Sequence, residues 1–187
     1  LMKQRLFITG GAGYVGAMLI DQFASRDDVE AIITLDKEQE TSLTSHHSHK
    51  DKITYIHANT SDDGWEAKVN AFEPTVVINT AWQIRHMYNN ELTEWKWNID
   101  GTDKVFNLAF TTASVKKLIH FSTVASYGAF ADNKLDHFYK EEEKFRKTRY
   151  LYAEEKRIAE EHLEERYQKA VATGWAGQVF IVRPAAI

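Results

Sequence analysis

Short apolar runs alternate along this chain with longer stretches in which apolar residues recur at helical spacing. The apolar runs cover residues 6–8, 31–36, 53–57, 75–79, 117–121 and 179–182. Each run is bounded by polar or turn-forming residues and is short enough to be a buried strand rather than a helix. The pattern therefore predicts six strands, with helices and loops between them.

The stretches between these runs predict four helices. The first follows the opening run and carries apolar residues at Val15, Leu19, Ile20 and Phe23. The other three are expected over residues 62–72, 88–113 and 150–169, and the shortest of them ends before a proline. Polar segments at residues 37–52 and 131–149 predict loops, the second of them with a helical turn.

One apolar face runs along the long helix expected at residues 88–113. Its residues follow the helical period and are Leu92, Trp95, Ile99, Thr102 and Phe106. We interpret this stripe as part of the core. A second stripe, Leu151, Ile158 and His162, is expected on the helix at residues 150–169.

Strands that alternate with helices predict an α/β fold, because each crossover returns the chain to a parallel sheet. We expect a Rossmann-type, doubly wound parallel sheet with helices on both faces. The length of 187 residues suggests a single domain over residues 1–187. Because the chain stops just after a strand-like run, we also expect it to be a fragment of a longer protein.

Composition excludes several classes of protein. A net charge of -4 gives no reason to expect a nucleic acid or an anionic membrane as partner. The chain has no cysteine, so disulfides, thiolate metal sites and cysteine nucleophiles are excluded, which fits a cytoplasmic location. No apolar run approaches the ~20 residues that a membrane-spanning helix needs.

A glycine-rich turn lies between the first predicted strand and the first predicted helix. Residues 9–16 read T-G-G-A-G-Y-V-G. Gly11, Gly13 and Gly16 match the dinucleotide fingerprint, and Gly10 adds a second spacing, G-x-x-G-x-x-G. Such a turn directs backbone N–H groups and a helix dipole toward a phosphate. The alternative is a tight turn without a ligand, but the flanking strand and helix favour a phosphate site.

Asp36 ends the second predicted strand, 20 residues after Gly16. At this distance an acidic residue commonly accepts hydrogen bonds from the hydroxyls of the adenosine ribose. A 2′-phosphate would meet like-charge repulsion from this carboxylate, so NAD is favoured over NADP. Lys37 argues against this preference, because a cation there could tolerate the 2′-phosphate of NADP.

Several polar or small residues lie at the carboxyl ends of the predicted strands, where open α/β sheets bind their ligands. They are Thr9, Asp36, Asn59, Ala81, Thr123 and Arg183. The three histidines at residues 46, 47 and 49 invite a metal interpretation, but no element holds them in a coordination shell. We expect a mobile surface loop there and no metal site.

A tyrosine and a lysine, Tyr152 and Lys156, lie four residues apart and so share one face of a helix. A phenol is a poor base near neutral pH, and a nearby ammonium lowers its pKa by favouring the phenolate. The hydroxyl of Thr123 could orient the reacting oxygen. An isolated match of this kind is usually an ordinary helix surface, and the glycine-rich turn upstream is what favours a catalytic interpretation.

These motifs together resemble the extended short-chain dehydrogenase/reductases, especially the NAD-dependent sugar-nucleotide epimerases and dehydratases. The resemblance rests on T-G-G-A-G-Y-V-G, Asp36, residues 98–102 (N-I-D-G-T), residues 121–128 (F-S-T-V-A-S-Y-G), Tyr152 with Lys156 and Glu160, and Arg183 with Pro184. It covers nearly the whole chain. It also implies a substrate domain, most of which is missing from this sequence.

The resemblance implies roles for particular residues. The catalytic set is Thr123, Tyr152 and Lys156. The NAD-binding set is Gly10, Gly13, Tyr14, Val15, Gly16, Asp36, Lys37, Asn59, Thr60, Thr80, Ala81, Trp82, Asn98, Tyr152, Lys156 and Arg183. Several positions depart from the family pattern. Ala58 and Asn59 stand where glycine and aspartate are common, and Ala186 stands where an asparagine is common. Trp82 stands where small residues are usual and narrows the cleft.

The resemblance implies an enzyme that oxidises a nucleotide sugar transiently, with Tyr152 as the general base and NAD as the cofactor. The alternatives are a reductase of a small carbonyl compound that uses NAD or NADP, and a dinucleotide-binding regulatory protein without catalysis. We further expect a homodimer formed through the helices near residues 88–113 and 150–169.

Overall fold

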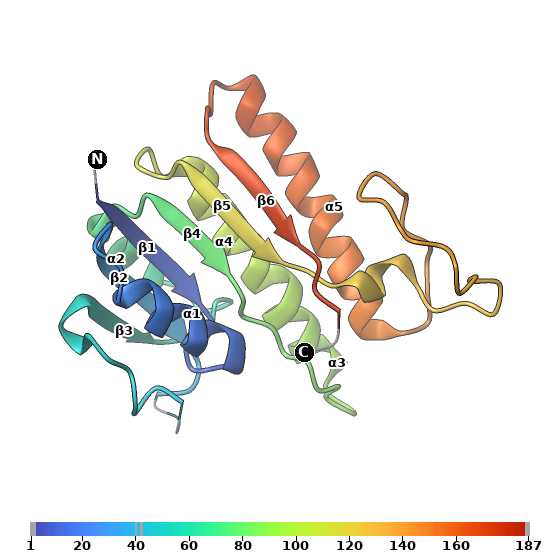
Figure 1. The fold of residues 1–187 in the computed structure, drawn as a ribbon, viewed down its shortest axis with the longest axis horizontal. Helices are drawn as coiled ribbons and strands as arrows, with labels where there is room; N and C mark the ends of the chain where they lie inside the picture. Colours follow the sequence, from blue (N-terminus) through green and yellow to red (C-terminus); the bar gives the residue numbers. More distant parts are fainter. Residues whose placement is uncertain (1–2, 40, 42, 186–187) are drawn as a thin grey trace.

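The fold is built on one parallel sheet of six strands, shown in Figure 1. The computed structural model describes residues 3–39, 41 and 43–185. The strands are β1 (Gln4–Thr9), β2 (Val29–Asp36), β3 (Ile53–His57), β4 (Val76–Asn79), β5 (Lys117–Phe121) and β6 (Gln178–Val182). Their order in the sheet is β3-β2-β1-β4-β5-β6, and every neighbouring pair is parallel. This is the strand order of the Rossmann fold, and it confirms the predicted fold class.

Four main helices cover the sheet. They are α1 (Tyr14–Ala24), α2 (Trp65–Phe72), α4 (Gly101–Thr111) and α5 (Leu151–Ala172). The short helix α3 (Glu91–Trp95) and a π-helical turn (Lys96–Asp100) lead directly into α4. Single turns of 3₁₀ helix occur at Lys50–Lys52 and Val124–Tyr127.

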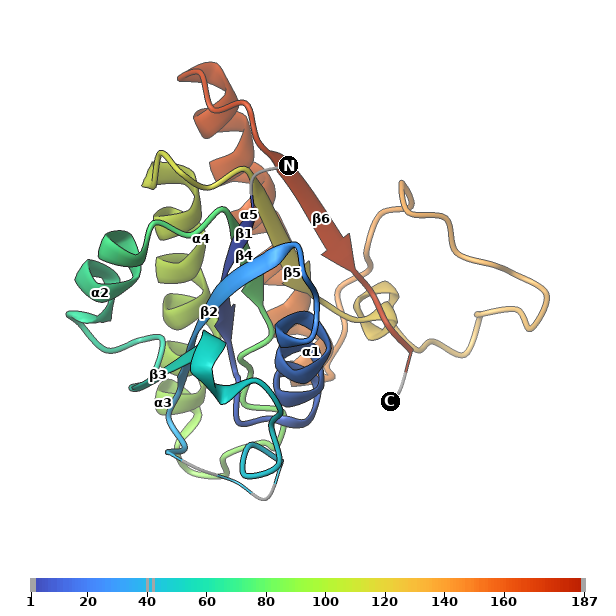
Figure 2. The ribbon, with the colours of Figure 1, turned by 60° about the vertical axis from the view of Figure 1, so that its left-hand side comes forward.

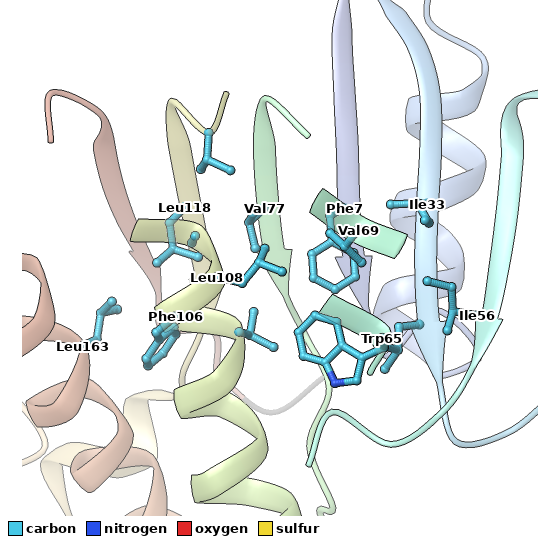
Figure 3. Packing of buried hydrophobic residues seen from close by; sticks show 14 residues of the cluster. Phe7, Ile33, Ile56, Trp65, Val69, Val77, Phe106, Leu108, Leu118 and Leu163 are labelled. Atoms are coloured by element: carbon cyan, nitrogen blue, oxygen red, sulfur yellow. The ribbon is translucent and has the colours of Figure 1, made fainter. Parts of the chain in front are cut away.

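The side chains of β1 point alternately to the two faces of the sheet, and each face has its own hydrophobic cluster. Phe7 belongs to the larger cluster, with residues of α2, α4 and α5, and it packs on Trp65 with ring centroids 5.6 Å apart (Figure 3). Leu6 and Ile8 belong to the smaller cluster, which α1 covers through Ile20. Burying one such side chain is worth about 1.5–3 kcal/mol, so both clusters hold the sheet in place.

The long helix differs from its prediction. It begins at Glu91 rather than residue 88, and the π-helical turn interrupts it. Ile99 and Phe106 are buried, but Leu92 is 88% exposed and Trp95 is 39% exposed, so the interpretation of these two as core is wrong. The physical reason is position: α3 lies beyond the tips of the strands, where no sheet is present beneath it (Figure 1).

The segment between the 3₁₀ turn and α5 contains turns but no helix, so the helical turn predicted within residues 131–149 is wrong. Figure 2 shows this segment as a long loop that extends away from the sheet. It lies on the side of β6, at the end of the sheet where the strands terminate. No helix among the described residues is both long and apolar enough to cross a lipid bilayer.

Candidate functional site

A cavity of about 930 Å³ opens at the carboxyl ends of the strands, where the sequence predicted a ligand cleft. The predicted residues that line it are Gly10, Gly13, Tyr14, Val15, Gly16, Asp36, Lys37, Asn59, Thr60, Thr80, Ala81, Trp82, Thr123, Tyr152 and Lys156. The topology brings them together because parallel strands all end at the same edge. Two predicted residues, Asn98 and Arg183, do not line the cavity.

The glycine-rich turn packs too closely to admit side chains. Gly10 has a φ of +73°, and a Cβ there would lie 2.8 Å from the backbone nitrogen of Ala81. A Cβ on Gly16 would lie 2.1 Å from the carbonyl oxygen of Gly10. Gly13 precedes α1 without a side-chain cap. The start of α1 is therefore a backbone cradle of the kind that binds phosphate.

Asp36 is held in a fixed orientation at the end of β2. Its Oδ2 accepts a hydrogen bond from Ala12 N at 2.9 Å, and its Oδ1 accepts one from Glu38 N at 2.9 Å. Each carboxylate oxygen has a second lone pair and can still accept from a ribose hydroxyl. Beside it, Lys37 pairs with Glu38 at 3.4 Å and lies over the ring of Trp97, with Nζ 5.0 Å from the centroid.

Asn59 lines the same end of the cavity, but its side chain also builds the loop after β3. Its Oδ1 accepts a hydrogen bond from Ser61 N at 2.9 Å, while its backbone N donates to Asp62 Oδ2 at 2.8 Å. The amide oxygen keeps one lone pair for a ligand. The assignment of Asn59 to the NAD-binding set thus stays a prediction.

Residues 80–84, which follow β4, form the wall of the cavity next to the glycine turn. Thr80 Oγ1 donates to the carbonyl oxygen of Thr9 at 2.6 Å. Asn98 Oδ1 accepts from Gln83 N at 2.7 Å, and Asn98 Nδ2 donates to the carbonyl oxygen of Gln83 at 3.1 Å. Asn98 is fully buried and anchors this part of the wall, and its assignment to the cofactor-binding set stays a prediction.

Thr123 lies two residues beyond the end of β5, and Tyr152 approaches it from α5. Thr123 is buried, and its Oγ1 accepts from Ala125 N at 3.1 Å. Burial raises the pKa of the Tyr152 phenol above its usual value, and a side-chain hydrogen bond with Thr123 acts in the opposite direction. The sequence predicted that Lys156 lowers this pKa, but the pKa of Tyr152 is raised instead, because burial dominates.

Lys156 is buried at the foot of the cavity. Its Nζ donates to the carbonyl oxygen of Phe121 at 2.6 Å and lies 3.7 Å from the centroid of the Trp82 ring. Burial lowers the pKa of Lys156 to about 7, and the negative charges of Glu160 and Glu155 oppose this shift. The indole nitrogen of Trp82 is itself buried and has no hydrogen-bond partner within the described structure.

Arg183 does not line the cavity, and its described contacts are with other parts of the fold, so its assignment as a cofactor ligand stays a prediction. Its guanidinium binds the Glu160 carboxylate, with Nη2 2.7 Å from Oε2. It also donates to the hydroxyl of Tyr127 at 2.9 Å and lies over the ring of Phe145 at 4.8 Å. Hydrogen bonds and charge raise the pKa of Arg183 against the opposing effect of burial. Arg183 therefore ties β6 to α5 and to the long loop.

The histidine cluster lies in a segment of turns after β2, and only His47 of the three is buried. His47 is buried, with Nδ1 2.6 Å from the hydroxyl of Tyr55 and Nε2 3.1 Å from the carbonyl oxygen of Ala17. It anchors the segment after β2 onto α1, so the predicted loop is present but His47 is buried within it. Within the described ranges, no group of three or more His, Asp or Glu side chains could hold a metal ion.

The cavity also contains residues that sequence reasoning missed. They are chiefly Gln83, Ile84, Trp97, Ala125, Asn133 and Tyr150. Tyr150 could have been found from its position two residues before Tyr152. Trp97 could not, because the π-helical turn sets its direction and the periodicity of the sequence does not reveal that turn.

The strand order, the glycine cradle and the carboxylate at the end of β2 define a dinucleotide-binding α/β domain. The model of the NAD dependent epimerase/dehydratase family matches residues 6–180. The chain belongs to this family, which confirms the resemblance deduced from its motifs.

Individual relatives agree with this assignment. A UDP-glucose 4-epimerase of Mycolicibacterium smegmatis is 27% identical over 129 residues, which cover 66% of this chain and 40% of the relative. The UDP-glucose 4-epimerase of Thermus thermophilus, solved in complex with NAD, superposes with a TM-score of 0.74 at 21% identity. The UDP-Glc/GlcNAc 4-epimerase of Campylobacter jejuni superposes with a TM-score of 0.76 at 21% identity.

These structural matches cover nearly all of this chain but only part of each relative. Both cover 96% of the chain, against 54% of the Thermus protein and 53% of the Campylobacter protein. The chain therefore spans about half the length of the solved relatives. At this level of identity the superpositions establish the fold.

Proposed function

We propose that this chain binds NAD in the cleft and acts in the transient oxidation of a nucleotide sugar, as an epimerase or a dehydratase does. The observation that carries the proposal is the meeting of Thr123, Tyr152 and Lys156 in one cavity with the glycine cradle. Family membership supports NAD as the cofactor. The names of the relatives support a UDP-sugar as the substrate class.

The residues at the cleft fit a dinucleotide. At Gly10 and Gly16 a Cβ would collide with backbone atoms, so the turn leaves the approach to the helix N-terminus open for a pyrophosphate. At the end of β2, Asp36 is already oriented by Ala12 N and retains lone pairs for ribose hydroxyls. The cavity volume of about 930 Å³ lies in the range of small-molecule sites.

In the proposed reaction Tyr152 takes the proton from a sugar hydroxyl, and the O–H bonding pair forms the new carbonyl bond. When bound, NAD would supply the hydride acceptor for the same carbon, and epimerisation would require the hydride to return to the opposite face of the ketone while Tyr152 gives the proton back. Thr123 shares a hydrogen bond with Tyr152 and orients the same sugar oxygen. Lys156 contributes a positive charge fixed by the carbonyl of Phe121.

For Tyr152 to accept a proton near neutral pH, its pKa must fall when the ligands bind. The hydrogen bond with Thr123 already acts in that direction. A cationic Lys156 acts in the same direction once the ammonium and the phenol bind a common ligand. We therefore propose that Lys156 assists Tyr152 in the liganded site rather than in the free one.

The test compares the Tyr152→Phe variant with the parent protein. NADH formation is followed in a single turnover with UDP-glucose, and NAD affinity is measured by calorimetry. Removal of the phenol should reduce hydride transfer by about a hundredfold or more, the usual size of a general acid/base contribution, and leave NAD affinity within about twofold. Tyr167→Phe is the matched control, because Tyr167 lies on the same helix but packs against Phe110 and Trp175.

Two outcomes would contradict the proposal. Hydride transfer that survives in Tyr152→Phe would remove this residue from the chemistry. NAD binding without hydride transfer to any UDP-sugar would favour the dinucleotide-binding protein without catalysis, or a reductase of another carbonyl compound.

We also propose that the protein forms a homodimer through α4 and α5, which pack side by side. Ile158 on α5 is only half-buried, and the apolar Leu92 and Trp95 on α3, which leads into α4, are exposed. Light scattering of a concentrated solution tests this, and a strict monomer would count against it.

The cytoplasmic location, the single domain over residues 1–187 and the missing substrate domain also stay predictions.

A further inference from the structure

Trp82 is carried on a segment of backbone with little freedom to move. On its N-terminal side, Ala81 N donates to Thr9 Oγ1 at 3.2 Å. On its C-terminal side, both the N–H and the carbonyl group of Gln83 are held by the side chain of Asn98. The position of the indole is therefore set by buried hydrogen bonds on both sides.

The indole covers the ammonium of Lys156. Nζ lies 3.7 Å from the ring centroid, well within the distance at which an aromatic face attracts a cation. The same nitrogen donates to the carbonyl oxygen of Phe121 at 2.6 Å. Lys156 is only 3% exposed, so water reaches the ammonium poorly.

The charged groups around Lys156 are largely committed elsewhere. On α5, Glu160 binds Arg183, and Glu155 accepts a hydrogen bond from Asn98. On β5, His120 is fully buried, and burial, with repulsion from Lys156, holds the pKa of its imidazole well below the usual value. Lys156 therefore has an aromatic face and a carbonyl oxygen as its immediate partners.

We propose that Trp82 is a positioning residue: its indole keeps water from the Lys156 ammonium and holds it against the carbonyl oxygen of Phe121. The proposal rests on the proposed function, in which Lys156 meets the bound ligands. Because burial lowers the pKa of Lys156 to about 7, the charge on this side chain changes within the neutral range. By keeping water from Lys156, the indole makes the charge of this side chain in the cavity depend on pH.

The test measures the pH midpoint at which Lys156 reacts with an amine-selective reagent, read by mass spectrometry of the peptide that carries Lys156 after the labelled protein is digested. A midpoint reports the pKa of the amine and not its accessibility. Trp82→Ala admits water, and because desolvation outweighs the lost attraction to the ring, the midpoint should rise by about one pH unit or more. Trp82→Phe retains an aromatic face, and its midpoint should stay close to that of the parent.

The control is Trp95→Ala, which removes a tryptophan of α3 that does not line the cavity, and its midpoint should not change. If Trp82→Ala does not fold, Trp82→Gln replaces it in the test. The glutamine fills part of the space but still lets water reach the ammonium, so the midpoint of Lys156 should rise in the same way. A midpoint that does not move in the folded variant would overturn the role of Trp82.

This measurement needs neither cofactor nor substrate, so it tests the inference about Trp82 independently of the proposed function. A parent protein that does not bind NAD would contradict the proposed function and leave the result on Trp82 in place. Normal NAD binding with an unmoved midpoint would overturn the inference about Trp82 alone.

Discussion

Asn98 donates a hydrogen bond of 2.7 Å to Glu155, although 57 residues separate the two in the chain. Both side chains are buried. The same amide of Asn98 also binds the backbone of Gln83. One asparagine thus joins the wall of the cleft to the helix that carries Lys156, and the two sides of the site cannot shift independently.

The first prediction concerns Asn98→Ala. The substitution removes three hydrogen bonds and leaves the Glu155 carboxyl buried without this donor. We expect the free energy of unfolding to fall by about 2–3 kcal/mol, since an unsatisfied buried group costs its full desolvation. Urea denaturation measures the loss. Asn107→Ala, at an exposed position of α4, is the control, and an equal loss there would contradict the explanation.

The fold could be predicted because the apolar runs, the helical periodicity and the turn residues of the sequence all indicated the same architecture. The six apolar runs became the six strands, and the glycine-rich turn between the first run and the first helix fixed the point where β1 meets α1. What failed was the stripe through Leu92 and Trp95. Periodicity reports that one face of a helix is apolar, but not whether a sheet extends beneath it.

The sequence predicted which residues lie in the cavity more readily than it predicted what each of them does there. Strand ends and motif spacing placed Asp36, Thr123 and Tyr152 in one cavity. The roles of Asn98 and Arg183 depend on hydrogen bonds to distant residues, which spacing does not encode. The state of Lys156 depends on how deeply Trp82 covers it, and burial of this kind becomes known only from the packed structure.

The second prediction concerns the pH dependence of stability through Glu155. Burial raises the pKa of this carboxyl, with repulsion from Glu94 adding and the hydrogen bond from Asn98 opposing. The folded state then holds the proton at a pH where the unfolded chain has released it, so stability falls as pH rises through this window.

Glu155→Gln removes that titration while keeping an oxygen for the amide of Asn98. The variant should therefore gain stability relative to the parent as the pH rises from acidic to neutral. Urea denaturation at several pH values measures the difference. Glu165→Gln, at an exposed position of the same helix, should not show this gain. A difference that is constant with pH would show that Glu155 does not titrate abnormally.

The third prediction separates a structural from a cofactor-binding role for Arg183. Arg183→Met leaves the carboxylate of Glu160, whose side chain is 5% exposed, without its partner. Breaking a buried pair costs about 3–5 kcal/mol, so the variant should be strongly destabilised. NAD affinity per folded molecule should stay within about twofold, because the guanidinium does not line the cavity.

Arg146→Met provides the matched control, since Arg146 pairs with Asp132 on the exposed long loop. An exposed pair contributes about 1 kcal/mol at most, so this variant should remain near the stability of the parent. A large loss of NAD affinity in folded Arg183→Met would instead support the assignment of Arg183 to the cofactor.

The last prediction concerns the choice between NAD and NADP. The carboxylate of Asp36 is fixed by Ala12 N and Glu38 N, so it cannot easily turn away from a 2′-phosphate. Lys37, the cation that could compensate, is paired with Glu38 and lies over Trp97. The parent protein should therefore bind NAD more tightly than NADP, as calorimetry with both nucleotides would show.

Asp36→Asn removes the charge but keeps an oxygen that can accept from Ala12 N. The preference for NAD should shrink by about tenfold, which corresponds to about 1.4 kcal/mol of repulsion relieved. Glu38→Gln, which neutralises an exposed carboxylate two residues away, should alter the preference less, because water screens an exposed charge. If the parent binds NADP as tightly as NAD, then Lys37 leaves its position over Trp97 to meet the phosphate, and the assignment of Asp36 as the determinant of cofactor choice is wrong.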